Sequence, residues 1–265
     1  MSPRRPATRR SRPRRARKVW VPLATIAVLL VVWQLVVVLG VVPNFMLPTP
    51  TQVMAALVGD FPLLVSNSAT TLAESALGLV IGCAVGFAFA VLMDRFEGFR
   101  LAFSPLITIS QTIPTIAVAP ILILWLGYGL APKVVLVVLT TFFPITVSLV
   151  SGFQSVDPDM VDLMRTMNAT CWQIFWQVKM PAAAEQFFSG LRISATYAIV
   201  GAVISEWLGG FSGLGVYMTR VRKSFSYDRM FAVIIIISAL SLALMGLVDA
   251  LQRLCMPWKR AEGEK

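Results

Sequence analysis

Long apolar stretches alternate with short polar segments along most of the chain. No charged residue occurs within residues 19–59, 101–132, 134–156 or 230–246. A helix needs about 20 mostly apolar residues to cross a hydrocarbon core about 30 Å thick. The stretches also lack the strict alternation of apolar and polar residues that is typical of the strands in a membrane β-barrel. The pattern therefore predicts an all-α, polytopic membrane protein.

Six transmembrane helices account for this pattern. Their expected ranges are 19–42, 68–93, 101–127, 133–152, 184–209 and 230–252. We expect residues 1–18 to form a basic tail, residues 19–255 to form one transmembrane domain and residues 256–265 to form a C-terminal tail. The composition agrees with this class of protein, since 57% of the residues are hydrophobic and only 14% are charged.

Basic residues indicate the orientation of the helices. Residues 1–18 contain nine Lys or Arg and no acidic residue. Such a block can bind nucleic acid, but beside a long apolar span it is more typical of a signal that keeps the N-terminus in the cytoplasm. Six spans then return the C-terminus to the cytoplasm, with eighteen basic residues inside and five outside. We therefore expect lipid, and no nucleic acid, as the surroundings of this chain.

Four of the five outer basic residues lie close together in "MTRVRKSFSYDRM". They are Arg220, Arg222, Lys223 and Arg229. Either this loop docks a partner at the membrane surface, or the last span is wrongly assigned. We favour the docking interpretation.

The sequence offers little support for an enzyme. It contains no His, which is the commonest general base and metal ligand. The three cysteines are far apart, and neither a C-x-x-C pair nor a G-x-x-x-x-G-K-[ST] phosphate-binding loop occurs. We expect no catalytic residue, metal ion or cofactor. Any uphill transport must then draw its energy from an ion gradient or from another chain.

A compact amphipathic segment, which we call the knuckle, occupies residues 157–181 between two spans. Asp157 followed by Pro158 predicts a helix start, because Asp caps free N–H groups and Pro suits the first helical position. Apolar residues then recur at a spacing of three or four up to Met167, and Asn168 is expected to end the helix in a left-handed conformation.

A second short helix is expected to follow directly. Thr170 and Gln173 match the T-x-x-Q capping box, and Pro181 is expected to close the helix. The side chains predicted to share one face of this helix are Trp172, Phe175, Trp176 and Lys179. Two short helices joined by a sharp turn indicate a rigid protrusion with an aromatic face that fits a groove in a partner protein.

The spacing in the knuckle resembles the cytoplasmic signature of binding-protein-dependent ABC importer permeases, E-A-A-x-x-x-G, nine residues, then I-x-L-P. Here the pattern falls on Asp162-Leu163-Met164, on Asn168 and on Val178-Lys179-Met180-Pro181. Asp replaces Glu, Asn replaces Gly, Val replaces Ile and Met replaces Leu. "TIPTIAVAPILILWLGYG" and "AVISEWLGGFSGLGVYM" are similar to the third span and the end of the fifth span of the sulfonate, taurine, nitrate and thiamine-precursor permeases.

This resemblance implies a set of partners in a bacterial inner membrane. They are a second permease subunit, expected to be an identical copy, a cytoplasmic ABC ATPase dimer and an extracytoplasmic solute-binding protein. The knuckle would seat in the ATPase, and both termini would be cytoplasmic. The residues expected at this ATPase interface are Asp162, Met164, Arg165, Asn168, Ala169, Trp172 and Phe175.

Polar residues within the spans are candidates for the substrate pathway, because they are costly in lipid and normally face the interior of the bundle. The candidates are Gln111, Thr112, Pro114, Thr115 and Glu206. Two prolines, Pro114 and Pro120, predict a kinked or locally unwound third span. For this kink, the alternative to a pathway role is packing without substrate contact.

Three further features, two acidic residues and one series of small residues, bear on the interior of the bundle. Glu206 could instead extend to the membrane surface. Glu74 is expected to be a structural partner of hydroxyls such as Ser68 or Thr71, in preference to the alternative that it contacts the substrate. Small residues at every fourth position, Gly78, Gly82 and Gly86, predict close helix packing.

Three functional classes follow, of which the ABC importer permease is the best supported. An ion-coupled secondary transporter would require more ionisable residues within the spans, and a membrane enzyme would require a catalytic cluster. The resemblance favours the pyrimidine precursor of thiamine as the substrate, with sulfonate, taurine or nitrate as alternatives.

Overall fold

A computed structural model describes residues 14–257, so residues 1–13 of the basic tail and 258–265 of the C-terminal tail lie outside the described part. Every regular element of the described chain is helical, which confirms the predicted fold class. The elements are α1 (Arg14–Val38), α2 (Pro50–Gly59), α3 (Phe61–Arg95), α4 (Glu97–Ser110), α5 (Thr115–Leu126), α6 (Leu130–Gln154), α7 (Pro158–Thr166), α8 (Cys171–Ile174), the π-helical segment η1 (Phe175–Lys179), α9 (Met180–Gly209), α10 (Leu214–Lys223) and α11 (Tyr227–Cys255).

The helices that can cross a membrane coincide with the predicted spans. Five are long and apolar enough individually: α1, α3, α6, α11 and the continuous run through α8, η1 and α9. The pair α4 and α5, which is bent by 101°, makes a sixth span if the two helices are counted as one broken span. The kink predicted in the third span is therefore confirmed, and its non-helical residues are 111–114.

Three long helices, α3, α6 and α9, form the packed centre of the bundle. The predicted close packing at the small residues of α3 is confirmed, because a Cβ atom added at Gly78 or Gly82 would collide with Val137 or Thr141 of α6. Along α6, residues such as Leu136, Ile145 and Leu149 are fully buried. Small side chains thus let the helices approach closely enough to exclude lipid from the centre.

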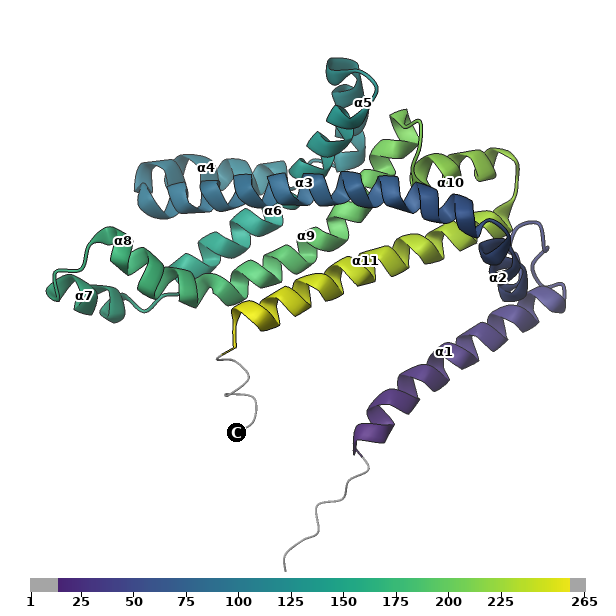
Figure 1. Cartoon of the computed structure of the whole chain (residues 1–265), viewed down its shortest axis with the longest axis horizontal. Helices are drawn as coiled ribbons and strands as arrows, with labels where there is room; N and C mark the ends of the chain where they lie inside the picture. Colours follow the sequence, from purple (N-terminus) through teal and green to yellow (C-terminus); the bar gives the residue numbers. More distant parts are fainter. Residues whose placement is uncertain (1–13, 258–265) are drawn as a thin grey trace, which may run out of the picture.

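Four short helices lie at the two ends of this bundle, whereas α5 projects from its middle (Figure 1). α7 and α8 protrude at one end, which we call the knuckle end, and α2 and α10 lie at the other, the α10 end. α1 lies apart from the central helices and contacts α11 through Trp33 and Phe231, whose ring centroids are 5.7 Å apart. The first residues of α1 and the last residues of α11 both point toward the knuckle end.

Candidate functional site

The first half of the knuckle is a short helix with its own caps. The Asp157 side chain accepts a hydrogen bond from the Asp159 N–H at 3.0 Å, and Pro158 occupies the first turn of α7. Asn168 adopts the left-handed conformation, with φ of 59°. The Ala169 N–H then donates to the Met164 carbonyl at 3.0 Å, which closes the turn. These local features confirm the helix and the turn that the sequence predicted.

The second half of the knuckle begins as predicted but ends differently. The capping box is present, with the Thr170 N–H donating to Gln173 Oε1 at 2.7 Å and the Gln173 N–H donating to Thr170 Oγ1 at 3.3 Å. The prediction that Pro181 closes this helix is wrong, because the chain continues through η1 into α9 and Pro181 lies in the first turn of α9. In η1 the hydrogen bonds span five residues, as from the Met180 N–H to the Phe175 carbonyl, and this register change accommodates a Pro that has no N–H.

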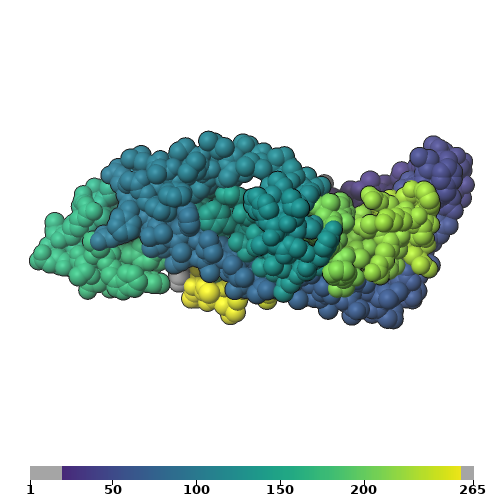
Figure 2. Space-filling view, turned by 90° about the horizontal axis from the view of Figure 1, so that it is seen from above, coloured from purple at the N-terminus to yellow at the C-terminus, as the bar shows by residue number. Residues whose placement is uncertain are grey.

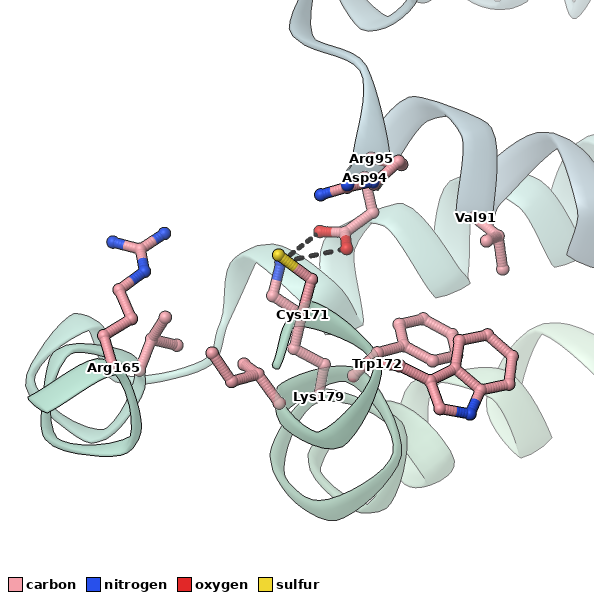
Figure 3. A pocket seen from close by; sticks show the side chains of 10 residues that line it. Val91, Asp94, Arg95, Arg165, Cys171, Trp172 and Lys179 are labelled. Carbon is pink, nitrogen blue, oxygen red and sulfur yellow. Dashed lines mark hydrogen bonds and ion pairs between the residues drawn. The ribbon is translucent and has the colours of Figure 1, made fainter. Parts of the chain in front are cut away.

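The knuckle is fixed to the bundle at its inner side (Figure 3). Lys179 Nζ lies 2.7 and 2.9 Å from the two carboxylate oxygens of Asp94, at the end of α3. Phe175 is only 9% exposed and packs on Phe153 of α6, with ring centroids 5.5 Å apart. Between α3, α7 and α8 a cavity of about 520 Å³ opens, and Trp172 and Arg165 are among its lining residues.

The outer side of the knuckle is apolar and exposed. Met160, Leu163 and Met167 of α7 are 58%, 60% and 71% exposed, and Trp172 is 68% exposed. The apolar spacing was visible in the sequence, yet our interface prediction included Met164, which is only half-buried, and omitted these three. Exposed large apolar residues on a protruding segment are typical of a protein or membrane contact.

The other residues predicted for the partner interface divide into three groups. Asp162 and Arg165 are exposed and form an ion pair of 3.0 Å with each other. Asn168 sets the turn, and Ala169 beside it is half-buried. Phe175 turns inward, so Trp172 is the aromatic residue among the seven that a partner can reach directly.

A second cavity, of about 340 Å³, lies at the break between α4 and α5. Three of the predicted pathway residues line it, namely Gln111, Pro114 and Thr115, and Thr112 lies in the same break. Sequence reasoning missed Thr140 and Tyr197, which α6 and α9 contribute to the same cavity. Their separation from residues 111–115 in the chain left no signal in the sequence.

Glu206 lies elsewhere, in a buried polar cluster near the α10 end. Its carboxylate accepts hydrogen bonds from the Thr71 hydroxyl at 2.7 Å and from the Gly215 N–H at 2.6 Å. The side chain is 1% exposed, so it does not extend to the membrane surface. It is not one of the residues that line the cavity at the α4–α5 break. Glu206 therefore joins α3 and α9 to the start of α10.

The same cluster contains a buried ion pair that the sequence did not reveal. Lys133 Nζ lies 2.6 Å from Glu74 Oε1, and both side chains are almost completely buried. The expectation that Glu74 bonds Ser68 or Thr71 is wrong: Thr71 bonds Glu206, and Ser68 bonds the carbonyl of Leu64. Lys133, which we counted among the outer loop charges, is also inside the bundle.

The remaining basic residues of the α10 end have mixed environments. Arg229 is paired with Asp60 at 3.1 Å, and the Tyr217 hydroxyl also donates to Asp60. Burial, together with this hydrogen bond to a carboxylate, raises the pKa of Tyr217 above its usual value. Arg220 donates to the Phe211 carbonyl at 3.2 Å. Arg222 and Lys223 at the end of α10 are exposed.

Comparison with known proteins identifies related sequences and a related fold. A family described as "Binding-protein-dependent transport system inner membrane component" matches residues 78–255. A probable ABC transporter permease of Haemophilus influenzae is 37% identical over 86% of this chain and 93% of its own length. The formylaminopyrimidine transport permease ThiX of Halalkalibacterium halodurans is 34% identical over 91% and 96%. Permeases named for aliphatic sulfonates, taurine and nitrate also match, at lower identity.

Among solved structures, one similar fold is the MetNI methionine ABC transporter in an inward-facing conformation. Its TM-score is 0.65, with 19% sequence identity over 73% of this chain and 96% of the other.

Proposed function

Given that the chain belongs to the family of binding-protein-dependent transport system inner membrane components, which are ABC importer permeases, we propose that it forms the translocation pathway for a small polar solute. In this proposal ATP is hydrolysed by a separate subunit that docks on the knuckle. The observation that carries the docking proposal is the exposed apolar surface of Met160, Leu163, Met167 and Trp172 on a rigid, internally capped segment.

The construction of the knuckle supports a role in transmitting movement. Its outer surface is free for a partner, whereas its inner side is held by the Lys179–Asp94 ion pair and by Phe175. A force applied to Trp172 therefore reaches α3 and α9 directly, because α8, η1 and α9 are continuous. The seven predicted interface residues have different parts in this proposal: Trp172 contacts the ATPase, Asn168 shapes the turn and Phe175 anchors the segment.

The proposed orientation places the knuckle end in the cytoplasm. The described ends of α1 and α11 point to that same end, as six spans with cytoplasmic termini require. Ser155 and Ser212 are both exposed; Ser155 lies between α6 and α7 of the knuckle end, and Ser212 lies between α9 and α10. After Cys83, Cys171 and Cys255 are replaced, a single Cys at position 155 should react only from the cytoplasm and one at 212 only from outside. Reaction of both from one side would contradict this topology.

We assign a different proposed partner to each end of the bundle. A second copy of the chain would complete the pathway, a pair of ABC ATPase subunits would bind the knuckle end, and a solute-binding protein would approach the α10 end. Exposed Arg222 and Lys223 offer that protein a basic surface. The substrate that we favour is the pyrimidine precursor of thiamine, in line with the similarity to ThiX. Sulfonate, taurine or nitrate import is the second candidate.

Co-purification with the ATPase tests the docking proposal. A tagged chain carrying Trp172→Ala should capture less ATPase, since loss of a buried aromatic anchor commonly costs about 2 kcal/mol or more at an interface. Trp125→Ala is the matched control, because Trp125 is 75% exposed on α5, away from the knuckle. Solute-stimulated ATP hydrolysis should fall together with capture. If Trp172→Ala captured as much ATPase and supported as much uptake as the unchanged chain, the docking proposal would be contradicted, and the knuckle would only connect two spans at the membrane surface.

A further inference from the structure

The cavity at the α4–α5 break is assembled from three separate parts of the chain. The break contributes Gln111 and Thr115, α6 contributes Thr140 and Phe143, and α9 contributes Tyr197. Figure 2 looks onto the face formed by α4 and α5, which is hollowed where the two helices meet. At about 340 Å³ the cavity is near the lower end of the range for small-molecule sites, which suits a compound of one or two rings.

This cavity lies about midway along α6 and α9, the two long helices that line it. Thr140 is ten residues from the start of α6 and fourteen from its end, at Leu130 and Gln154. Tyr197 is seventeen residues from the start of α9 and twelve from its end. Broken helices that leave irregular backbone at the midplane are a common way for transporters to build solute sites.

Contact with lipid would be unfavourable for the non-helical backbone and the Tyr197 hydroxyl at this cavity. Residues 111–114 are exposed and non-helical, and non-helical backbone at membrane depth is tolerated only when it is covered by protein or lines a watery cavity. Tyr197 is 51% exposed at the same depth, where an unpaired hydroxyl in hydrocarbon would cost free energy. The open side of the cavity is therefore expected to face the interior of the assembled transporter rather than lipid, as a solute pathway requires.

The lining of the cavity is polar but uncharged. Ser110, Thr115, Thr140 and Tyr197 supply hydroxyls, Gln111 supplies an amide, and Phe143 supplies a second aromatic ring. The hydroxyls of Ser110 and Thr140 already donate to carbonyls of their own helices at 2.7 and 2.8 Å, which leaves their oxygen atoms as acceptors. The lining residues include neither Lys nor Arg, so a bound anion would lose its hydration without gaining an opposite charge.

We propose that this cavity binds the transported solute, and that the solute is an uncharged, flat, nitrogen-containing aromatic compound with hydrogen-bonding groups. Tyr197 and Phe143 offer ring contacts, and Gln111 and the hydroxyls bond the edge of the ring. This proposal rests on the proposed import function and narrows its substrate: an aminopyrimidine fits the lining, whereas a sulfonate, taurine or nitrate does not.

Uptake by the complete transporter tests the site. The permease, its ATPase and its solute-binding protein are reconstituted together in proteoliposomes, and ATP-dependent uptake of radiolabelled formylaminopyrimidine is measured. Tyr197→Ala should lower the specificity constant of uptake about tenfold, the effect of losing one good aromatic contact, while Tyr197→Phe keeps most of it. Tyr128→Ala is the matched control, since Tyr128 is 71% exposed and does not line this cavity.

A second variant separates loss of the contact from misfolding. In a background without the native cysteines, Tyr197→Cys should react with a charged, water-soluble thiol reagent, and formylaminopyrimidine should slow that reaction. A residue that faces lipid would stay unreactive, which would overturn the proposal. Uptake by Tyr197→Ala equal to that of the unchanged chain would also overturn it.

Failure of this proposal can be told apart from failure of the import function. ATP-dependent uptake of ethanesulfonate or nitrate, without uptake of the aminopyrimidine, would overturn the uncharged site and leave the importer intact. Absence of any ATPase capture by the unchanged chain would instead contradict the import function. Competition by other uncharged heteroaromatic compounds, but not by sulfonates, would support the proposed class of solute.

Discussion

α7 and α10 are short helices of nine and ten residues at opposite ends of the same bundle, yet they are held in different ways. Five residues of α10 are buried, including Leu214 and Tyr217, and its first turn is bonded by Glu206 of α9 and Thr71 of α3. None of the residues of α7 is buried, and its N-terminal cap and closing turn come from its own segment. α10 is therefore part of the bundle's core, whereas α7 is a self-contained unit that presents its surface outward.

The largest expected effect concerns the polar cluster near α10. Lys133→Met leaves Glu74 buried without its partner, and breaking a buried ion pair in this way costs about 3–5 kcal/mol of unfolding free energy. Denaturation in detergent should therefore show a strongly destabilised protein. Adding Glu74→Leu to the same variant should restore much of the stability. Equal stability of Lys133→Met and the unchanged chain would show that the pair does not hold this end together.

A smaller loss of stability is expected when the carboxylate of Glu206, which bonds the start of α10 to α9, is removed. Glu206→Ala removes the acceptor for the Thr71 hydroxyl and the Gly215 N–H, and leaving a buried donor without its acceptor costs about 1–3 kcal/mol. Hydrogen exchange at Gly215 and Val216 should accelerate, while exchange in α7 stays the same. Glu97→Ala, which alters an exposed side chain, is the control. Faster exchange in α7 would contradict the independence of the two ends.

At the knuckle end, the turn should respond locally. Asn168→Val places a β-branched residue at φ of 59°, where the left-handed conformation costs about 1–2 kcal/mol. Capture of the ATPase and uptake should fall, whereas the denaturation midpoint of the bundle should hardly change. Asn168→Gly is the matched control and should retain capture. A large drop in the stability of the whole bundle would mean that the knuckle is not self-contained.

The smallest effect is expected at the capping box. Thr170→Ala removes the side-chain acceptor of the Gln173 N–H, and loss of such a cap costs about 1 kcal/mol. Exchange of the amide hydrogens in α8 should become faster, with little change in uptake. Thr166→Ala is a suitable comparison, because the Thr166 hydroxyl only bonds a carbonyl of its own helix. Identical exchange in the two variants would show that the box does not stabilise α8.

The features that could be predicted from the sequence are those that depend on residues close together in the chain. Apolar length marked the spans, Pro114 marked the break and the spacing of Thr170 and Gln173 marked the capping box. The prediction at Pro181 was wrong because a proline can occupy the first turn of a helix as well as follow its end. No pattern in the neighbouring residues predicts the π-helical hydrogen bonds of η1.

Contacts between residues far apart in the chain could not be predicted from the sequence, because they depend on how the helices pack. Lys133 and Glu74 are 59 positions apart, and only the packing of α3 on α6 brings them together. In the same way, Thr140 and Tyr197 join residues 111–115 through the tertiary fold. Phe175 and Trp172 look alike in the sequence, but only the position of Phe153 decides which of them turns inward.

The helical run from Cys171 to Gly209 is continuous, but it changes direction at η1, where α9 begins (Figure 1). The 30 residues of α9 at 1.5 Å each give a length of about 45 Å beyond η1, with Glu206 near the far end. A tilt of about 5° about η1 would therefore move the far end of α9 by about 4 Å. The π-helical segment η1 lies close to the knuckle and beside the Asp94 anchor, where a fulcrum would give the short arm to the ATPase and the long arm to the far side of the membrane.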